Sequence, residues 1–170
     1  MKNPRKYIYP VIVLAVAVFL YYNNLQESYK TNFRGLPITI EFRKGDVKSG
    51  TDVFGNQWSK VLKHHYGYFD GIMGADGKEL DVYINPDNEF INSSKIFRIE
   101  QLNVKTGEFD EYKIMLGFDT WHEAGNAYLN NMPRHWGTER WGTEQFVDGI
   151  RVRKPNFFGS IEEITLEDIK

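Results

Sequence analysis

The feature that most constrains this 170-residue chain is a series of short segments in which apolar and polar residues alternate. Residues 38–42 read ITIEF and residues 95–104 read KIFRIEQLNV. Side chains of a β-strand point alternately to its two faces, so this period predicts half-buried strands. Further strands are expected over residues 81–84 and 112–116, with turn residues such as Asn85-Pro86-Asp87 between the segments. Residues 45–58, GDVKSGTDVFGNQW, contain three glycines and are expected to form a turn-rich loop. The pattern predicts a mostly antiparallel sheet.

A helix is expected after these strands. Thr120 precedes the segment WHEAGNAYLNNM, and Glu123 follows three residues later, which is the spacing of a capping box. A final short helix is expected over residues 166–170, with Thr165 as its cap. Strands followed by a late helix predict an α+β fold or a small barrel.

The N-terminal residues differ from the rest. Residues 7–22 read YIYPVIVLAVAVFLYY, an uncharged and almost wholly apolar run with tyrosines at both ends. A membrane-spanning helix needs about 17–25 such residues, and no small-residue cleavage site of a signal peptide follows. We therefore expect residues 1–22 to form a single-pass anchor in a lipid bilayer. Lys2, Arg5 and Lys6 precede the run, so the positive-inside rule predicts a cytoplasmic N-terminus and a domain on the opposite side.

Charge and cysteine content exclude several classes of function. The chain has 21 basic and 23 acidic residues, so no basic face for nucleic acid is indicated. It has no cysteine, which excludes a thiolate metal site and a cysteine nucleophile. The polar residues 23–34 are typical of a linker, and residues 35–170 are expected to form one domain.

Two aspartates mark a candidate metal site. Asp76 and Asp81 lie in the segment GADGKELDVYI, where a turn marked by glycine enters an apolar strand. Carboxylates in such a turn can bind Mg²⁺, which prefers oxygen ligands, but Asp-Gly is also a common turn pair. A second acidic pair, Asp110 and Glu111, begins another strand. The residues alone leave a metal site and a plain turn both open.

Basic and phenolic side chains offer groups for a phosphate ligand. A phosphate-handling site combines acids that hold metal with Lys, Arg or Tyr side chains that bind phosphate oxygens. Such groups are present in Lys48, Lys113, Tyr66 and Tyr68. Each lysine is equally typical of a solvated surface, and each tyrosine of strand packing. The histidines have no metal-ligand spacing, and the chain lacks a P-loop and a dinucleotide-binding fingerprint.

Several segments together resemble a known family. The segments are IEFRKGDVKSG, HYGY, GADGKELDVYI, QLNVKTGEFDEYKIMLGF and GSIEEIT. They are similar to the inorganic-pyrophosphatase-like domain of phage and mobile-element polyvalent proteins, and more distantly to soluble family I inorganic pyrophosphatases. The resemblance spans Gly35 to Lys170, with extra sequence between Trp136 and Phe158. It implies an α+β fold, a small five-stranded OB-like antiparallel β-barrel with flanking helices. It also implies hydrolysis of pyrophosphate or a related phosphoanhydride with Mg²⁺.

The resemblance implies roles for nine residues. The expected metal ligands are Asp76, Asp81, Asp110 and Glu111. Asp81 and Tyr66 are also expected to be catalytic, and the expected substrate-binding residues are Glu41, Lys48, Tyr68 and Lys113. Asp76 and Asp81 match the outer acids of the family's D-x-D-x-x-D motif.

Two positions depart from the family pattern. Lys78 stands where the family has the middle aspartate of that motif, and Asn103 stands where it has another acid. Two unit charges about 4 Å apart interact by about 4 kcal/mol at an effective dielectric of 20, so a lysine there opposes metal binding.

Two functional hypotheses follow. The first is a membrane-anchored Mg²⁺-dependent diphosphatase. The second is the same fold without activity, as a structural or interaction module with protein partners in a membrane or a phage particle. Convergence of Asp76, Asp81 and Asp110 on one pocket with the two lysines would favour a ligand site. Ion pairs from Lys78 to Asp76 and Asp81 would favour a structural one.

Overall fold

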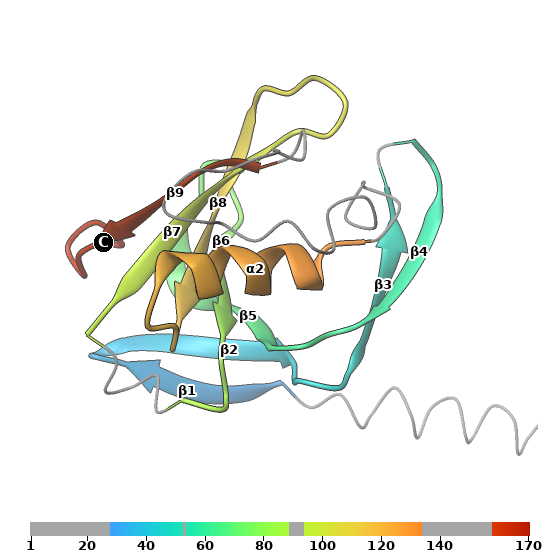
Figure 1. Ribbon diagram of the computed structural model, residues 1–170. Coiled ribbons are helices and arrows are strands. Elements are labelled where there is room, and N and C mark those ends of the chain that lie inside the picture. The colour runs from blue at the N-terminus through green and yellow to red at the C-terminus, as the bar shows by residue number, and fades with distance from the viewer. Residues whose placement is uncertain (1–27, 53, 89–93, 134–157) are drawn as a thin grey trace, which may run out of the picture.

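The computed structural model describes residues 28–52, 54–88, 94–133 and 158–170. Within these ranges the chain is mostly β-structure with one short helix (Figure 1). In chain order the elements are β1 (Tyr29–Phe33), β2 (Leu36–Phe42), β3 (Val47–Thr51), β4 (Gln57–Val61), β5 (His65–Met73), β6 (Glu79–Ile84), β7 (Ile96–Leu102), β8 (Phe109–Leu116), α2 (Trp121–Asn131) and β9 (Phe158–Ile164).

Seven strands form one mixed sheet in the order β1-β2-β5-β6-β8-β7-β9, and β3 pairs only with β4. The pairs are antiparallel except β6 with β8, which run parallel. The expectation of a closed antiparallel barrel is therefore wrong. The physical reason lies in the β7–β8 hairpin. Its second strand pairs with β6, so β7 lies outside it and extends the sheet to β9 instead of closing it.

The expected strands agree with the observed ones, since residues 38–42, 81–84, 95–104 and 112–116 overlap β2, β6, β7 and β8. The expected helix is also confirmed, because Thr120 accepts a hydrogen bond from the backbone N–H of Glu123 at the start of α2. The expectation of further flanking helices is wrong for residues 166–170. They form a turn in which the Asp168 carboxylate accepts hydrogen bonds from Thr165.

Two segments expected to be irregular contain strands. Strand β1 lies within residues 23–34, which we expected to be a linker, and it pairs along its length with β2. Residues 45–58, which are rich in glycine and read as a loop, contain most of the β3–β4 hairpin. Within the described ranges no helix is long and apolar enough to cross a membrane. The expected anchor, residues 7–22, lies outside those ranges.

Apolar side chains form two clusters, one on each face of the sheet. One cluster joins α2 to the sheet through Tyr128, Phe97 and Met115. The other extends across the sheet, from Phe33 of β1 through Val82 of β6 to Ile164 of β9. Figure 1 shows α2 between the seven-stranded sheet and the β3–β4 hairpin. The hairpin and the chain that follows it are fastened to the end of this helix, because Lys60 Nζ donates to the backbone oxygen of Met132 at 2.5 Å.

Candidate active site

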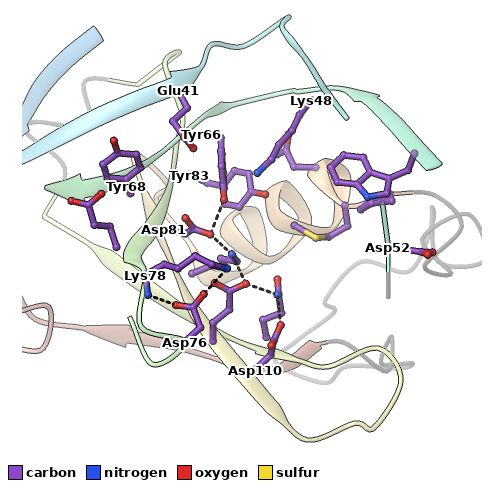
Figure 2. A pocket seen from close by; sticks show the side chains of 18 of the residues that line it. Glu41, Lys48, Asp52, Tyr66, Tyr68, Asp76, Lys78, Asp81, Tyr83 and Asp110 are labelled. Carbon is purple, nitrogen blue, oxygen red and sulfur yellow. Dashed lines mark hydrogen bonds and ion pairs between the residues drawn. The ribbon is translucent and has the colours of Figure 1, made fainter. Parts of the chain in front are cut away.

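A cavity of about 610 Å³ is lined by the sheet, the β3–β4 hairpin and the C-terminal end of α2 (Figure 2). The nine residues expected from the sequence to form a site all line it. They are Glu41, Lys48, Tyr66, Tyr68, Asp76, Asp81, Asp110, Glu111 and Lys113. They come from β2, β3, β5, β6, β8 and the turn between β5 and β6. The fold therefore brings together the groups that the motifs singled out.

Two of the acids stand at irregularities of the sheet. Ile40 and Phe42 of β2 pair with consecutive residues of β5, which makes Glu41 an extra residue between them. Asp110 is likewise the extra residue between two successive pairs of β7 with β8. A β-bulge re-aims a side chain relative to the regular alternation. These bulges give Glu41 and Asp110 their place on the cavity wall.

The two tyrosines of the YGY segment depend on the glycine between them. A β-carbon at Gly67 would lie 1.9 Å from the backbone oxygen of Thr39. No real side chain fits there, so only glycine permits this approach of β5 to β2. Tyr66 and Tyr68 lie two residues apart on β5, so they share one face of the strand, and both line the cavity.

The centre of the site is an ion pair between neighbouring parallel strands. Asp81 of β6 and Lys113 of β8 are in register, and Lys113 Nζ donates to Asp81 Oδ2. Tyr66 donates its hydroxyl to the same carboxylate oxygen at 2.7 Å. Lys113 also pairs with Glu111 Oε1 at 2.7 Å, and its side chain is only 7 % exposed. A buried ammonium is thus shared by two carboxylates.

Burial shifts the proton affinities of several of these groups. Burial raises the pKa of Glu111, and the Lys113 ammonium opposes that shift. Burial also raises the pKa of Glu41, and burial together with the Asp81 charge raises the pKa of Tyr66 well above its ordinary value. Tyr66 therefore stays protonated as a hydrogen-bond donor throughout the physiological pH range.

Lys48 has a different environment. Its ammonium lies 3.3 Å from the centre of the Tyr66 ring, a cation–π contact. Burial, followed by the repulsion of Lys113, lowers the pKa of Lys48 to about 8. Lys48 therefore carries its positive charge at neutral pH but loses it within the mildly alkaline range.

Lys78 is bound to one of the two aspartates of its turn. Its Nζ lies 3.1 Å from Asp76 Oδ2, and its backbone N–H donates to Asp76 Oδ1 at 3.0 Å. The backbone hydrogen bond from Lys78, helped by its side chain, lowers the pKa of Asp76. The cation paired with Asp81 is Lys113 instead. The structure therefore has features of both a ligand site and a structural site. The acids converge on one cavity with the two lysines, but Lys78 forms an ion pair with Asp76.

The motifs did not single out Gln101. Its amide nitrogen donates to Asp110 Oδ2 at 2.9 Å and to Glu111 Oε1 at 2.7 Å, and its oxygen accepts from the Tyr128 hydroxyl. Gln101 is buried, and it fixes both carboxylates to β7. A polar residue at an inward position of an alternating strand is the signal that could have identified it. Asn103 does not line the cavity, and its side chain accepts hydrogen bonds within the β7–β8 turn.

The donor set can be compared with the needs of a divalent cation. Seven carboxylates line the cavity against three lysines, Lys48, Lys78 and Lys113. Carboxylate oxygens are the ligands that Mg²⁺ prefers, and the excess of negative charge suits it. Within the described ranges, however, no three acidic or histidine side chains form a ready metal cluster. Lysines and Gln101 instead pair with several of the carboxylates. The residues therefore fit Mg²⁺ by chemistry and charge, and its binding would displace these ammonium groups. The seven carboxylates are Glu41, Asp52, Asp76, Glu79, Asp81, Asp110 and Glu111.

Comparison with protein-family models matches residues 21–151, well over half of the chain, to the family described as Inorganic Pyrophosphatase. Comparisons with curated proteins and with solved structures gave no significant match. The match agrees with the family that the sequence motifs resemble. The chain belongs to the inorganic pyrophosphatase family.

Proposed function

We propose that the cavity binds and hydrolyses pyrophosphate or a related phosphoanhydride with Mg²⁺. One observation carries the proposal. The acids, tyrosines and lysines expected to perform this chemistry come from separate strands and line one cavity. A set of purely structural surface charges would have no reason to share one concave site.

The charge of the cavity supports the need for a metal. Seven carboxylates face three lysines, which leaves an excess of four negative charges before any ligand enters. A phosphoanhydride is itself strongly anionic, so these charges repel it. Bound Mg²⁺ would neutralise phosphate oxygens and lower the pKa of a bound water. The residues proposed to hold it are Asp76, Asp81, Asp110 and Glu111.

The protein's own groups have separate tasks in this proposal. Lys113 and Lys48 neutralise phosphate oxygens, because both ammonium groups line the cavity and Lys48 is charged at neutral pH. Tyr66 keeps the Asp81 carboxylate in one orientation through its hydroxyl hydrogen bond. Tyr68 and Glu41 complete the walls around the phosphates. These groups bind and orient the substrate before the anhydride bond breaks.

A second candidate is a binding module without catalytic activity. The ion pair between Lys78 and Asp76 favours it, because it occupies one of the proposed metal ligands with a fixed cation. In that case the same cavity, or another surface, would serve protein partners in a membrane or virion assembly.

The test is phosphate release from pyrophosphate by the full chain with Mg²⁺. We expect Mg²⁺-dependent release that Asp81→Asn abolishes. The matched control is Asp87→Asn, which removes an exposed carboxylate that pairs with Lys44 and does not line the cavity. Release by a Lys78→Asp variant alone would support the inactive module. No release by either protein would reject the hydrolysis of pyrophosphate.

We also propose that residues 7–22 anchor the protein in a membrane, with the N-terminus in the cytoplasm and the domain on the opposite side. The support is the uncharged apolar run and the basic residues before it. Resistance to carbonate extraction from the membrane fraction, and protease access to the domain from the non-cytoplasmic side only, are the expected results. Recovery in the soluble fraction would contradict the proposal.

A further inference from the structure

One end of the cavity has no task in the binding of inorganic pyrophosphate. It is lined by Trp58 of β4 and by Met132 and Pro133 after α2. Figure 2 shows the labelled Asp52 of the hairpin at the opposite end of the cavity from Tyr68 and Asp76. Inorganic pyrophosphate presents only charged oxygens, whereas these three side chains offer apolar surface.

The wall at this end is fixed in place. Lys60 Nζ donates to the backbone oxygen of Met132 at 2.5 Å, and the backbone N–H of Lys63 donates to the Asn131 side chain at 2.8 Å. These bonds join the hairpin and the residues after it to the end of the helix. Trp58 and Met132 therefore belong to one preformed surface, as small-molecule sites usually do.

The indole of Trp58 is held on the inner face of the hairpin. Gly50 pairs with Trp58 across β3 and β4. A β-carbon at Gly50 would lie 2.9 Å from Trp58 Cζ2 and 3.1 Å from Cε2. Glycine at this position thus makes room for the ring to lie against the neighbouring strand. Trp58 is only half-buried and lines the cavity, so part of the residue is accessible to a ligand there.

Lys48 links this end to the acidic end. It lies two residues before Gly50 on β3, so both residues occupy the same face of that strand. Its ammonium stands over the Tyr66 ring beside the central ion pair. A ligand whose phosphates reach Lys48 and Lys113 can therefore extend along the hairpin to Trp58.

We infer that the ligand of this cavity is a nucleoside phosphoanhydride whose base lies on Trp58. The inference rests on the proposed function, and it names the substrate class of that same site. A base stacks on an aromatic side chain through its flat face, which an aliphatic diphosphate cannot do. The cavity volume of about 610 Å³ falls in the range of about 300–1,000 Å³ that organic ligands occupy.

The reaction is a hydrolysis and needs no further reactant. With a nucleoside diphosphate, the oxygen of a water forms a bond to the terminal phosphorus. The bond from that phosphorus to the bridging oxygen breaks, and the nucleoside monophosphate leaves with the bonding electrons. The protons released by the water pass to solvent as the inorganic phosphate ionises.

The test is a calorimetric titration of the full chain in Mg²⁺ with two non-hydrolysable ligands. These are methylenediphosphonate and α,β-methylene-ADP, which differ in the nucleoside. We expect the nucleoside analogue to bind about tenfold more tightly, from one stacked base. Trp58→Ala should remove this difference by weakening the nucleoside analogue, and Trp58→Phe should restore most of it. The matched control is Phe54→Ala, an exposed aromatic of the same hairpin that does not line the cavity.

The other possible results distinguish a failure of the nucleoside inference from a failure of the proposed function. Equal affinities, or binding of methylenediphosphonate alone, would overturn the nucleoside inference and leave the proposed function standing. A preference for the nucleoside analogue that survives Trp58→Ala would overturn the placement of the base. Binding of neither ligand would overturn the proposed function together with the inference.

Discussion

Lys78→Met is the substitution that tests most directly how this chain can use Mg²⁺. It removes the ammonium that lies 3.1 Å from Asp76 and keeps a side chain of similar length. The Lys78 side chain is 84 % exposed, and exposed ion pairs contribute only about 0–1 kcal/mol to stability. The backbone hydrogen bond that is the main cause of the lowered Asp76 pKa also remains. We therefore expect the free energy of unfolding without Mg²⁺ to stay almost unchanged.

The effect on Mg²⁺ should be larger. A divalent cation and an ammonium about 4 Å apart repel by about 2 kcal/mol in water of dielectric 80. The exposed lysine can turn away and salt screens it, so about 1 kcal/mol of this repulsion remains. That energy corresponds to about a fivefold gain in Mg²⁺ affinity for Lys78→Met. Because Lys78 is exposed, this repulsion energy is smaller than the value of about 4 kcal/mol expected from the sequence for a lysine enclosed in the site.

Two measurements check the gain. One is the Mg²⁺ concentration at half-maximal phosphate release from pyrophosphate. The other, independent of activity, is the rise of the melting temperature with Mg²⁺, which follows from binding to the folded state. The matched control is Lys170→Met, which removes an exposed lysine that also lies 3.1 Å from a carboxylate but does not line the cavity. An unchanged Mg²⁺ midpoint for Lys78→Met, or an equal shift for Lys170→Met, would refute the reasoning.

Four further predictions concern buried or partly buried parts of the site. Lys113→Met should lower the free energy of unfolding by about 3–5 kcal/mol in urea denaturation, because two largely enclosed carboxylates lose their cation; a loss below about 1 kcal/mol would contradict this. The Lys48 pKa of about 8 predicts that the KM for pyrophosphate rises as pH increases through 8, and that Lys48→Arg flattens this rise. Folding lowers the pKa of Lys48 from 10.5, so the unfolded chain binds more protons than the folded chain between about pH 8 and 10.5. Lys48 therefore makes the free energy of unfolding increase with pH over this range. Lys48→Met should abolish this increase. Gly67→Ala should cost at least about 3 kcal/mol in thermal unfolding, since its β-carbon would meet the backbone of Thr39; a near-normal melting temperature would count against the close approach.

The sequence predicted which chemical groups form the site better than it predicted how their side chains are directed into the cavity. Acids, lysines and tyrosines were identified from motifs, because the residue types that serve phosphate chemistry are few. Glu41 and Asp110 reach the cavity wall through bulges, which depend on the register between two strands. No local pattern in one strand reveals that register. The inward position of Gln101 is a local signal, but its carboxylate partners lie on another strand, so its role in the site depends on the same register.

The fold was predicted where the signals are local. The cap of α2 at Thr120 and the alternation in β2 and β7 are properties of neighbouring residues. The parallel pairing of β6 with β8 joins strands that are not consecutive, and it separates the open sheet from the expected barrel. The prediction of a loop over residues 45–58 is wrong because glycines at positions 45, 50 and 55 mask the short strands of the β3–β4 hairpin.

The pairing of Asp81 with Lys113 also determines when the site can form during folding. The two residues are 32 positions apart, and they meet only after the β7–β8 hairpin has docked onto β6. The hairpin itself closes through local contacts, which form early, whereas docking must first overcome the entropy of a long loop. Ligand binding during refolding should therefore lag behind the appearance of β-structure. For this chain, a competent site reports that a non-local step of folding, the docking of the β7–β8 hairpin on β6, is complete.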